Sequence, residues 1–270
     1  MIGQSGLIKT VLRQIQSDVF PRFSIFVGST GSEKNEMAKV VAEALGAHCV
    51  NSTDCKVDTI RDIITASYKV TALTVYNITD ADTMSLQARN ALLKVTEEPP
   101  NKAYFVMTLS DINNTLPTIK SRGAVYVLEP YTRAELEQYC FKFSYSEEQL
   151  DIVLQLCDTP GQIELLHSYG PKAFFEYVQK VVDNIAVASG SNSFKIAQSI
   201  KLNVKTENDG YDLELFWKAF CAVCLQRGAY KGLLLTSSYL SRISNKSINK
   251  AMLFDQWILD IRKEWLDGSK

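Results

Sequence analysis

The stretch "FSIFVGSTGSEKNEMAKVVAEALG", residues 23–46, decides how the first part of the chain folds. An apolar run leads into a glycine-containing turn and then into a segment with helical periodicity, which predicts a strand, a loop and a helix in succession. The loop nearly matches the phosphate-binding pattern G-x-x-x-x-G-K-[ST], because Gly28 and Lys34 have the correct spacing. Two positions differ: Glu33 replaces the second glycine, and Asn35 replaces the hydroxyl residue.

The two differences weaken the loop as a nucleotide site. In an intact loop, backbone N–H groups surround the β-phosphate, the lysine balances charge on the outer phosphates, and the hydroxyl holds Mg²⁺. Glu33 would obstruct the backbone approach and bring a negative charge toward the phosphates. At about 4 Å and an effective dielectric of about 20, the repulsion is of order 4 kcal/mol per pair of charges. With only Gly28 and Lys34 left of the pattern, and Gly31 as a further glycine of the loop, tight Mg-ATP binding is disfavoured. Taken alone, the loop fits a degenerate phosphate site and a chance turn equally well.

The bulk composition bounds the function only loosely. A chain of 270 residues with 46% hydrophobic and 22% charged residues is typical of a soluble globular protein of two or three domains. Its formal net charge of -1 gives no global attraction to nucleic acid or to anionic membranes. No run of about 18 apolar residues is present and the first residues lack a secretory-signal pattern, so we expect a cytoplasmic protein that does not associate with membranes.

The six cysteines do not predict a metal site. They are scattered, and the one C-x-x-C pair, Cys221 and Cys224, has no second pair or histidine cluster to complete a zinc tetrahedron. This pair lies in the apolar, helix-periodic stretch "FWKAFCAVCL", which favours a place in a helical core.

Residues 1–130 alternate short apolar runs with amphipathic stretches, the pattern of an α/β fold with a mainly parallel sheet. Strands are expected at 23–28, 48–51, 73–78, 103–109 and 124–129. Helices are expected at 6–16, 34–46, 58–67, 85–98 and, as a short turn, near 116–122.

After Pro130 the strand signals end. Capping boxes begin two helices, one at Thr132 with Glu135 and one at Ser146 with Gln149, and "TPGQIELLHS" begins a third. Residues 131–170 are therefore expected to form a small helical domain, and residues 171–270 to form further amphipathic helices.

A second site shows matching changes. In ATPases with a phosphate-binding loop, a neighbouring strand ends in acidic residues that hold Mg²⁺ and polarise the attacking water. Here the expected strand leads into "TDAD", so Thr79 takes the position of the metal-holding aspartate and Asp80 that of the catalytic carboxylate. The alternative is an ordinary strand followed by a polar turn.

Two longer motifs carry a resemblance to a known family. "NALLKVTEEPP", residues 90–100, and "LPTIKSRG", residues 116–123, resemble the AAA+ clamp-loader family, which carries N-A-L-L-K-x-x-E-E-P-P and L-P-T-I-x-S-R-C. Gly123 replaces the family cysteine. The start "IGQSGLIKTVLRQI" also fits, and the resemblance covers roughly residues 1–169. It implies a degenerate P-loop-type AAA+ core at 1–130, a helical lid domain at 131–170 and an all-α collar domain at 171–270.

Within this family the chain looks most like a member whose nucleotide site is defunct. Active members keep G-K-[ST] and an acidic box, and many carry a four-cysteine zinc module that this chain lacks. Gln162 stands at the usual place of the sensor-2 arginine. Changes at Glu33, Asn35, Thr79 and Gln162 together indicate that hydrolysis is absent. We therefore expect no bound cofactor, with ATP and Mg²⁺ belonging to a neighbouring subunit.

The resemblance also implies a role for Arg122, which matches the S-R-C arginine. In the family this arginine reaches the ATP site of the neighbouring subunit and stabilises charge on the transferring phosphoryl group. Arginine suits this role because its fork stays charged and bonds phosphate oxygens bidentately. The alternative is that Arg122 only caps a helix C-terminus.

Partners follow from the same resemblance. We expect other clamp-loader subunits to bind through the collar and the AAA+ faces, and we expect contacts with primer-template DNA and with the sliding clamp. Thr59 and Arg61 are candidates for DNA phosphate contacts at a helix N-terminus, with Asp58 as the expected N-cap. The alternative is a solvated helix start. DNA binding by the isolated chain should be weak and salt-sensitive.

The C-terminal helices carry apolar stripes that fit either a core or a collar interface. The stripe residues are Trp217, Phe220, Trp257, Ile258, Ile261 and Trp265.

The sequence thus predicts a non-hydrolysing subunit of the DNA polymerase III sliding-clamp loader that offers Arg122 in trans during DNA replication. Two alternatives stay open: an active ATPase subunit of the loader, and an AAA+ adaptor of another replication complex.

Overall fold

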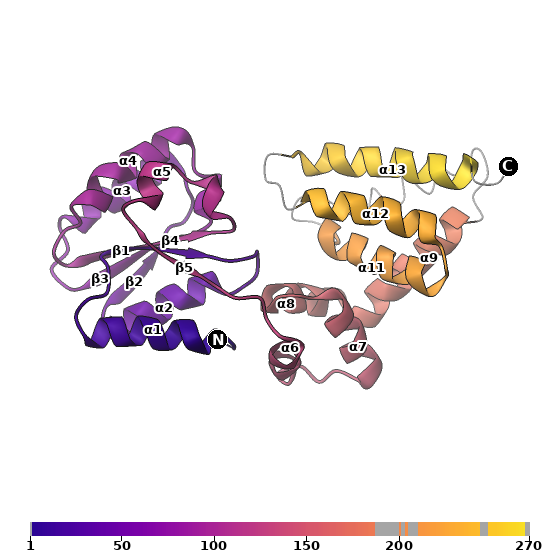
Figure 1. The fold of residues 1–270 in the computed structure, drawn as a ribbon, viewed down its shortest axis with the longest axis horizontal. Helices are drawn as coiled ribbons and strands as arrows, with labels where there is room; N and C mark the ends of the chain where they lie inside the picture. Colours follow the sequence, from indigo (N-terminus) through magenta and orange to yellow (C-terminus); the bar gives the residue numbers. More distant parts are fainter. Residues whose placement is uncertain (1, 187–199, 201–202, 205–209, 244–247, 268–270) are drawn as a thin grey trace. The chain divides into compact units, whose positions relative to one another are not determined.

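Figure 1 shows the computed structural model, which describes residues 2–186, 200, 203–204, 210–243 and 248–267, and the side chains of these except 262 and 265–267. The chain forms two compact units. The first unit comprises Met1–Tyr139 and Asp158–Gly161, and the second comprises Cys140–Cys157 and Gln162–Lys270. The boundary expected near residue 170 between a lid and a collar stays a prediction.

The first unit is built on a five-stranded sheet in the order β2-β3-β4-β1-β5. All of its strand pairs are parallel, which confirms the predicted α/β architecture. Its strands are β1 Phe23–Val27, β2 His48–Asn51, β3 Thr74–Ile78, β4 Ala103–Leu109 and β5 Ala124–Val127. Each lies within two residues of its expected position.

Helices cover both faces of this sheet. Figure 1 shows α1 and α2 on one side and α3, α4 and α5 on the other. The helices of the first unit are α1 Ser5–Gln16, α2 Lys34–Leu45, α3 Val57–Ser67, α4 Leu86–Glu97, α5 Pro117–Lys120 and α6 Arg133–Cys140, with short 3₁₀ turns η1 Ala81–Thr83 and η2 Ile112–Asn114.

The alternation of side chains along the strands divides the core into two layers. In β1, Phe23, Ile25 and Val27 pack in the layer that contains residues of α3, α4 and α5. Phe26 packs in the layer with α1 and α2. Because both layers are apolar, the central strands are buried on both faces, as parallel sheets are.

The second unit is helical. Its helices are α7 Glu147–Leu156, α8 Pro160–Tyr169, whose first two residues belong to the first unit, α9 Pro171–Ala186, α11 Leu213–Gln226, α12 Tyr230–Ile243 and α13 Lys250–Asp267. An aromatic cluster of α11 and α13 fills the core, with Trp257 edge-on to Phe216 and Phe220.

Five of the six stripe residues belong to this core. Trp217, Phe220 and Trp257 are fully buried, and Ile258 and Ile261 are nearly so. The side chain of Trp265 lies outside the described residues. In the part of the chain that the structure describes, no helix is both long enough and apolar enough to cross a lipid bilayer.

The glycine at the family's cysteine position has a packing reason. Gly123 lies just before β5, and a Cβ added there would come 2.8 Å from Cδ1 of Ile25 and 2.8 Å from Cε1 of Phe23. Both side chains are buried in the core. A cysteine or any larger residue would therefore overpack the sheet at this point.

We expect Gly123→Ala to lower the free energy of unfolding by about 1–3 kcal/mol, because the added methyl group strains a filled core. Urea unfolding measures the change. Gly6→Ala in α1 is the matched control, because a Cβ there meets nothing within 4 Å. It should be neutral or stabilise by up to about 1 kcal/mol. Equal effects of the two substitutions would contradict the packing argument.

Candidate functional site

The degenerate loop lies at the carboxyl end of β1 and leads into α2, the place where parallel α/β sheets bind ligands. Glu33 is the N-cap of α2 with φ 59° and ψ 29°, in the left-handed region, and Gly31 has φ 79°. A residue with a Cβ pays roughly 1–2 kcal/mol for this conformation. Glu33 therefore keeps the backbone shape of the missing glycine and adds a charged side chain to it.

Lys34 points into the loop itself. Its ammonium donates hydrogen bonds to the carbonyl oxygens of Gly28 at 2.8 Å and Ser29 at 2.7 Å. The residue is only 7% exposed. The Ser32 hydroxyl donates to the same Ser29 carbonyl at 2.7 Å. The loop thus uses the lysine to satisfy its own backbone.

Two other segments hold the outside of the loop. The Tyr131 hydroxyl donates to the Ser32 carbonyl at 3.1 Å and lies 3.5 Å from a carboxylate oxygen of Glu33. Burial, with the negative charge of Glu33 as a smaller cause, raises the pKa of Tyr131. The Gly161 amide donates to the Gly31 carbonyl at 3.0 Å.

The contact between these two glycines is very close. A Cβ added at Gly161 would lie 2.6 Å from Cα of Gly31. The loop is therefore packed against backbone as well as bonded to it, and a larger residue at position 161 would force the two segments apart.

Neutral polar groups join the loop to the end of β3. The Asn77 amide donates to Oδ1 of Asn35 at 3.4 Å and to Oδ1 of Asn51 at 2.8 Å. The Thr108 hydroxyl, on β4, is 3.5 Å from the same Asn35 oxygen and accepts a hydrogen bond from the Asp80 amide at 3.1 Å. The Thr108 hydroxyl therefore lies between the Asn35 side chain and the backbone amide of Asp80.

Thr79 and Asp80 differ from what a metal site needs. The Thr79 amide donates to the Ser52 hydroxyl at 3.0 Å, and the two hydroxyls are 3.3 Å apart. Asp80 is exposed and has φ 49°. Mg²⁺ prefers carboxylate and water oxygens in octahedral geometry, and the end of β3 offers one carboxylate between a threonine and an alanine. No cluster of three or more His, Cys, Asp or Glu side chains that could hold a metal occurs among the described residues.

Sequence motifs did not identify Asn51, Asn77 and Thr108 as parts of this network. Asn77 is fully buried in β3 and Thr108 is 1% exposed in β4. The available signal in the sequence was a polar residue inside an otherwise apolar strand. Such a residue indicates a buried hydrogen-bond network, because a buried polar group needs a hydrogen-bond partner.

Gln162, at the sensor-2 position, is bonded within the second unit. Its amide donates to Glu214 at 2.9 Å, and Lys218 donates to its side-chain oxygen at 3.3 Å. Lys218 and Glu214 are also an ion pair at 3.1 Å. Gln162 thus takes part in a hydrogen-bonded triad on α8 and α11.

Arg122 follows α5 and is held by two groups of its own chain. Its Nε donates to Oε1 of Glu97 at 2.8 Å, and its Nη2 donates to the same oxygen. Its Nη1 donates to the Thr118 carbonyl at 2.5 Å. The contact with Thr118 is a helix-capping contact, and 29% of the Arg122 side chain stays exposed. Capping of α5 is therefore present, and it engages only part of the guanidinium.

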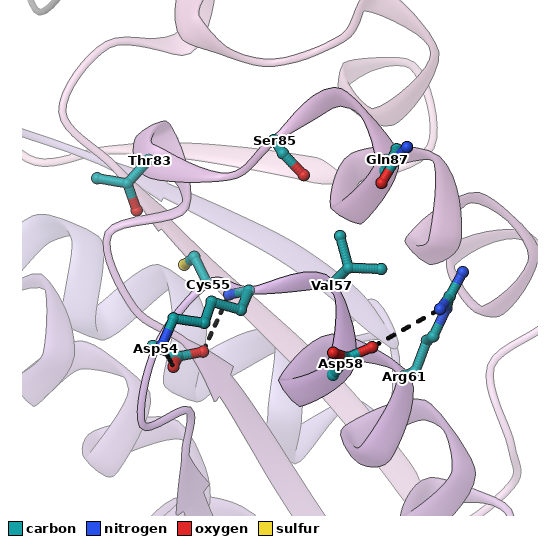
Figure 2. Close-up of a pocket in the computed structure, with 9 residues that line it drawn as sticks. Asp54, Cys55, Val57, Asp58, Arg61, Thr83, Ser85 and Gln87 are labelled. Carbon is teal, nitrogen blue, oxygen red and sulfur yellow. Dashed lines mark hydrogen bonds and ion pairs between the residues drawn. The ribbon is translucent and has the colours of Figure 1, made fainter.

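A pocket of about 660 Å³ lies where α3 begins, beside the turn before α4. Figure 2 shows Thr83, Ser85 and Gln87 across from the start of α3. The helix begins at Val57, so the expected N-cap at Asp58 is wrong: Lys56 is the N-cap. The Asp54 carboxylate accepts a hydrogen bond from the Lys56 amide at 2.9 Å, and this turn starts the helix earlier.

Both candidate phosphate contacts of α3 have acidic partners, and of the two Arg61 lines the pocket. A hydrogen bond from the Thr59 hydroxyl is the largest cause that lowers the pKa of Asp54. Arg61 lies 3.7 Å from Asp58 in an exposed ion pair, which Figure 2 marks with a dashed line. Thr59 and Arg61 would have to leave these carboxylates to bind a phosphate.

Comparisons with known proteins find similarity to subunits of DNA polymerase III. Residues 47–132 match the family described as DNA polymerase III, delta subunit. The tau subunit of DNA polymerase III from Bacillus subtilis (strain 168) is 28% identical over 152 residues, 45% of this chain and 27% of that protein. The gamma subunit from Buchnera aphidicola subsp. Acyrthosiphon pisum is 29% identical over 181 residues, 56% of this chain and 50% of that protein. The chain spans about a quarter to a half of the length of these relatives.

Two solved structures show the same fold. A DNA polymerase III gamma subunit-related protein from Thermotoga maritima has a TM-score of 0.56 at 17% identity, covering 95% of this chain and 98% of that one. The RuvB Holliday junction branch migration motor of Thermotoga maritima has a TM-score of 0.50 at 16% identity, covering 84% of this chain and 88% of that one. The chain is thus similar in sequence to the tau and gamma subunits of DNA polymerase III, and similar in fold to a gamma subunit-related protein.

Proposed function

We propose that this chain is a non-hydrolysing subunit of the DNA polymerase III clamp loader, most like the delta prime subunit. It acts as a scaffold in the assembled loader and presents Arg122 to the ATP site of a neighbouring subunit. The observation that carries the proposal is the position of Lys34, whose ammonium bonds two carbonyls of its own loop.

The loop chemistry supports a site that does not turn over ATP. To reach a phosphate, Lys34 must leave two charge-assisted hydrogen bonds, of which the one to the Gly28 carbonyl is buried and the one to the Ser29 carbonyl is partly buried. The phosphate would also approach the carboxylate of Glu33, which stands where the backbone must come close. In an active ATPase each of the two motifs supplies one Mg²⁺ ligand. At these positions the chain has an amide, Asn35 at the start of α2, and a hydroxyl, Thr79 just after β3.

The surroundings of Arg122 support a role in trans. A guanidinium that stabilises charge on a neighbour's phosphate must be held in place and must keep N–H groups for the phosphate. Arg122 meets both needs, because Glu97 and Thr118 hold it and part of its side chain is exposed.

The partners in this proposal are the other loader subunits, with primer-template DNA and the sliding clamp bound in the assembly. Arg61, which lines the pocket at α3, and Thr59 of the same helix would contact a DNA phosphate once the loader presents the strand to them. Their acidic partners explain why the isolated chain should bind DNA weakly. An active ATPase subunit and an AAA+ adaptor of another replication complex are the competing functions.

A nucleotide titration separates the scaffold from the active ATPase. The purified chain, titrated with labelled ATP and Mg²⁺, should show no micromolar affinity and no hydrolysis, because both motifs lack their Mg²⁺ ligands. The reconstituted loader in the same buffer is the positive control. Micromolar affinity for Mg-ATP accompanied by hydrolysis would contradict the scaffold proposal and support an active ATPase subunit.

The inward lysine has a consequence for stability without any nucleotide. Lys34→Met keeps the length of the side chain and leaves the carbonyls of Gly28 and Ser29 without this donor, so the free energy of unfolding should fall by about 1–3 kcal/mol. Lys39→Met, on the exposed face of α2, should change it by less than about 0.5 kcal/mol. A neutral Lys34→Met would mean that the lysine is not structural.

Arg122→Ala tests the action in trans. In a reconstituted loader, the single-turnover rate at the affected ATP site should fall by about 100-fold or more, because an arginine finger contributes on the order of 10³–10⁵. Lys120→Ala removes a neighbouring exposed cation of α5 and should leave the rate unchanged. Gel filtration should find both variants assembled. An unchanged rate with Arg122→Ala would reject the finger.

A further inference from the structure

Glu97 and Arg122 form a hydrogen-bonded ion pair outside the loop that joins β1 to α2. Glu97 is the last residue of α4, and Arg122 follows α5. The two are 25 residues apart in the chain. Ile119 of α5 and Leu92 of α4 belong to the same buried layer of the core. The packing of these helices therefore sets the distance between the carboxylate and the guanidinium.

Glu97 takes one particular edge of the guanidinium. A guanidinium has five N–H donors in a planar fork. Oε1 of Glu97 accepts from both Nε and Nη2, which make up the side-on edge. The Thr118 carbonyl accepts from Nη1.

Three donors are used in these bonds, and one N–H on each of Nη1 and Nη2 is left. The N–H left on Nη2 lies on the end-on edge between Nη1 and Nη2, the edge at which a guanidinium can bind two oxygens of a phosphate at once.

We propose that Glu97 is a positioning residue that fixes the Arg122 guanidinium with its end-on fork turned outward for a phosphoryl group bound to a neighbouring subunit. This inference rests on the proposed function. Glu97 itself touches no nucleotide; it acts through Arg122. The Thr118 carbonyl accepts a third hydrogen bond, from Nη1. The plane of the guanidinium is therefore fixed by α4, through Glu97, and by α5, through Thr118.

Exposure decides what the pair can contribute. Half of the Glu97 side chain is exposed, compared with 29% of that of Arg122. An ion pair open to water adds little to stability, because solvent screens it and the side chains lose freedom. Its effect on orientation is different: a flexible arginine held in one rotamer meets the phosphate without losing that freedom in the transition state.

The opposite role makes an opposite prediction. If Glu97 restrained Arg122 and had to be displaced before the finger could act, removing the carboxylate would raise the turnover of the neighbouring ATP site. The direction of the rate change therefore separates positioning from restraint.

The chain offers a matched set of variants. Glu97→Ala removes the acceptor, and Glu97→Gln keeps a neutral acceptor oxygen at the same reach. Glu98→Ala is the control, because Glu98 is the adjacent exposed carboxylate and caps α4 only through its backbone. Each full-length variant is assembled into the loader with its clamp and primer-template DNA, and kcat and KM for ATP are measured.

We expect Glu97→Ala to lower kcat by about 10-fold to 100-fold, the effect of a catalytic group displaced by about 1 Å. The KM for ATP should stay within about 3-fold, because binding in the neighbouring subunit does not use this carboxylate. Glu97→Gln should recover part of the rate, and Glu98→Ala should leave it unchanged. In an Arg122→Ala background, Glu97→Ala should cause no further loss, because the two residues act as one unit.

The outcomes distinguish this inference from the proposed function. If Arg122→Ala leaves the rate unchanged, the finger and its positioning residue are both rejected. If Arg122→Ala lowers the rate while Glu97→Ala leaves it unchanged or raises it, only the role of Glu97 is rejected. If Glu97→Ala does not assemble, Glu97→Gln carries the test: a kcat reduced with intact assembly supports positioning, and a kcat equal to that of the unsubstituted loader overturns it.

Discussion

The pairing of β1 with β4 on one side and β5 on the other is the constraint on which the first unit depends. It buries β1 on both faces, so the chain must leave the sheet at the carboxyl end of β1 in a tight loop. The same pairing sets Leu109 and Val127 beside Val27. The loop, the end of β4 and the segment after β5 are therefore brought to one edge, whatever chemistry the residues there provide.

At this edge the loop differs from the phosphate-binding pattern at Glu33 and Asn35. Glu33 holds a backbone conformation suited to glycine, and Lys34 fills the concave side of the loop with its own ammonium. Asn35, Asn77 and Thr108 form a network of neutral side chains. In a nucleotide site, phosphates and Mg²⁺ would balance their charges at this place. The Asn77 amide nitrogen donates to Asn35 and to Asn51, whereas its own buried side-chain oxygen has no hydrogen-bond partner among the described residues.

Arg122 and the loop before α2 are positioned by different elements of the first unit. The residue is placed by α4 and α5, on the opposite face of the sheet from α2. Its contacts with Glu97 and Thr118 do not involve the degenerate loop. The position of Arg122 therefore does not depend on the contacts within that loop.

The sequence by itself determined the order of strands and helices, the capping boxes at Thr132 and Ser146, and the altered positions of both motifs. These follow from hydrophobic periodicity and from side chains within a few residues of each other. The start of α3 was misplaced because two nearby aspartates, Asp54 and Asp58, could each end the preceding turn, and a backbone contact at Lys56 chose between them.

Only the tertiary structure decided the direction of Lys34, the network around Asn77, the exclusion of a side chain at Gly123 and the pairing of Arg122 with Glu97. Apart from the lysine, these contacts join residues brought together by the packing of separate helices and strands. The lysine itself could face outward or inward, and the sequence pattern is the same for both. Periodicity states which residues share an element, whereas contacts between elements depend on register, helix placement and the space left inside the core.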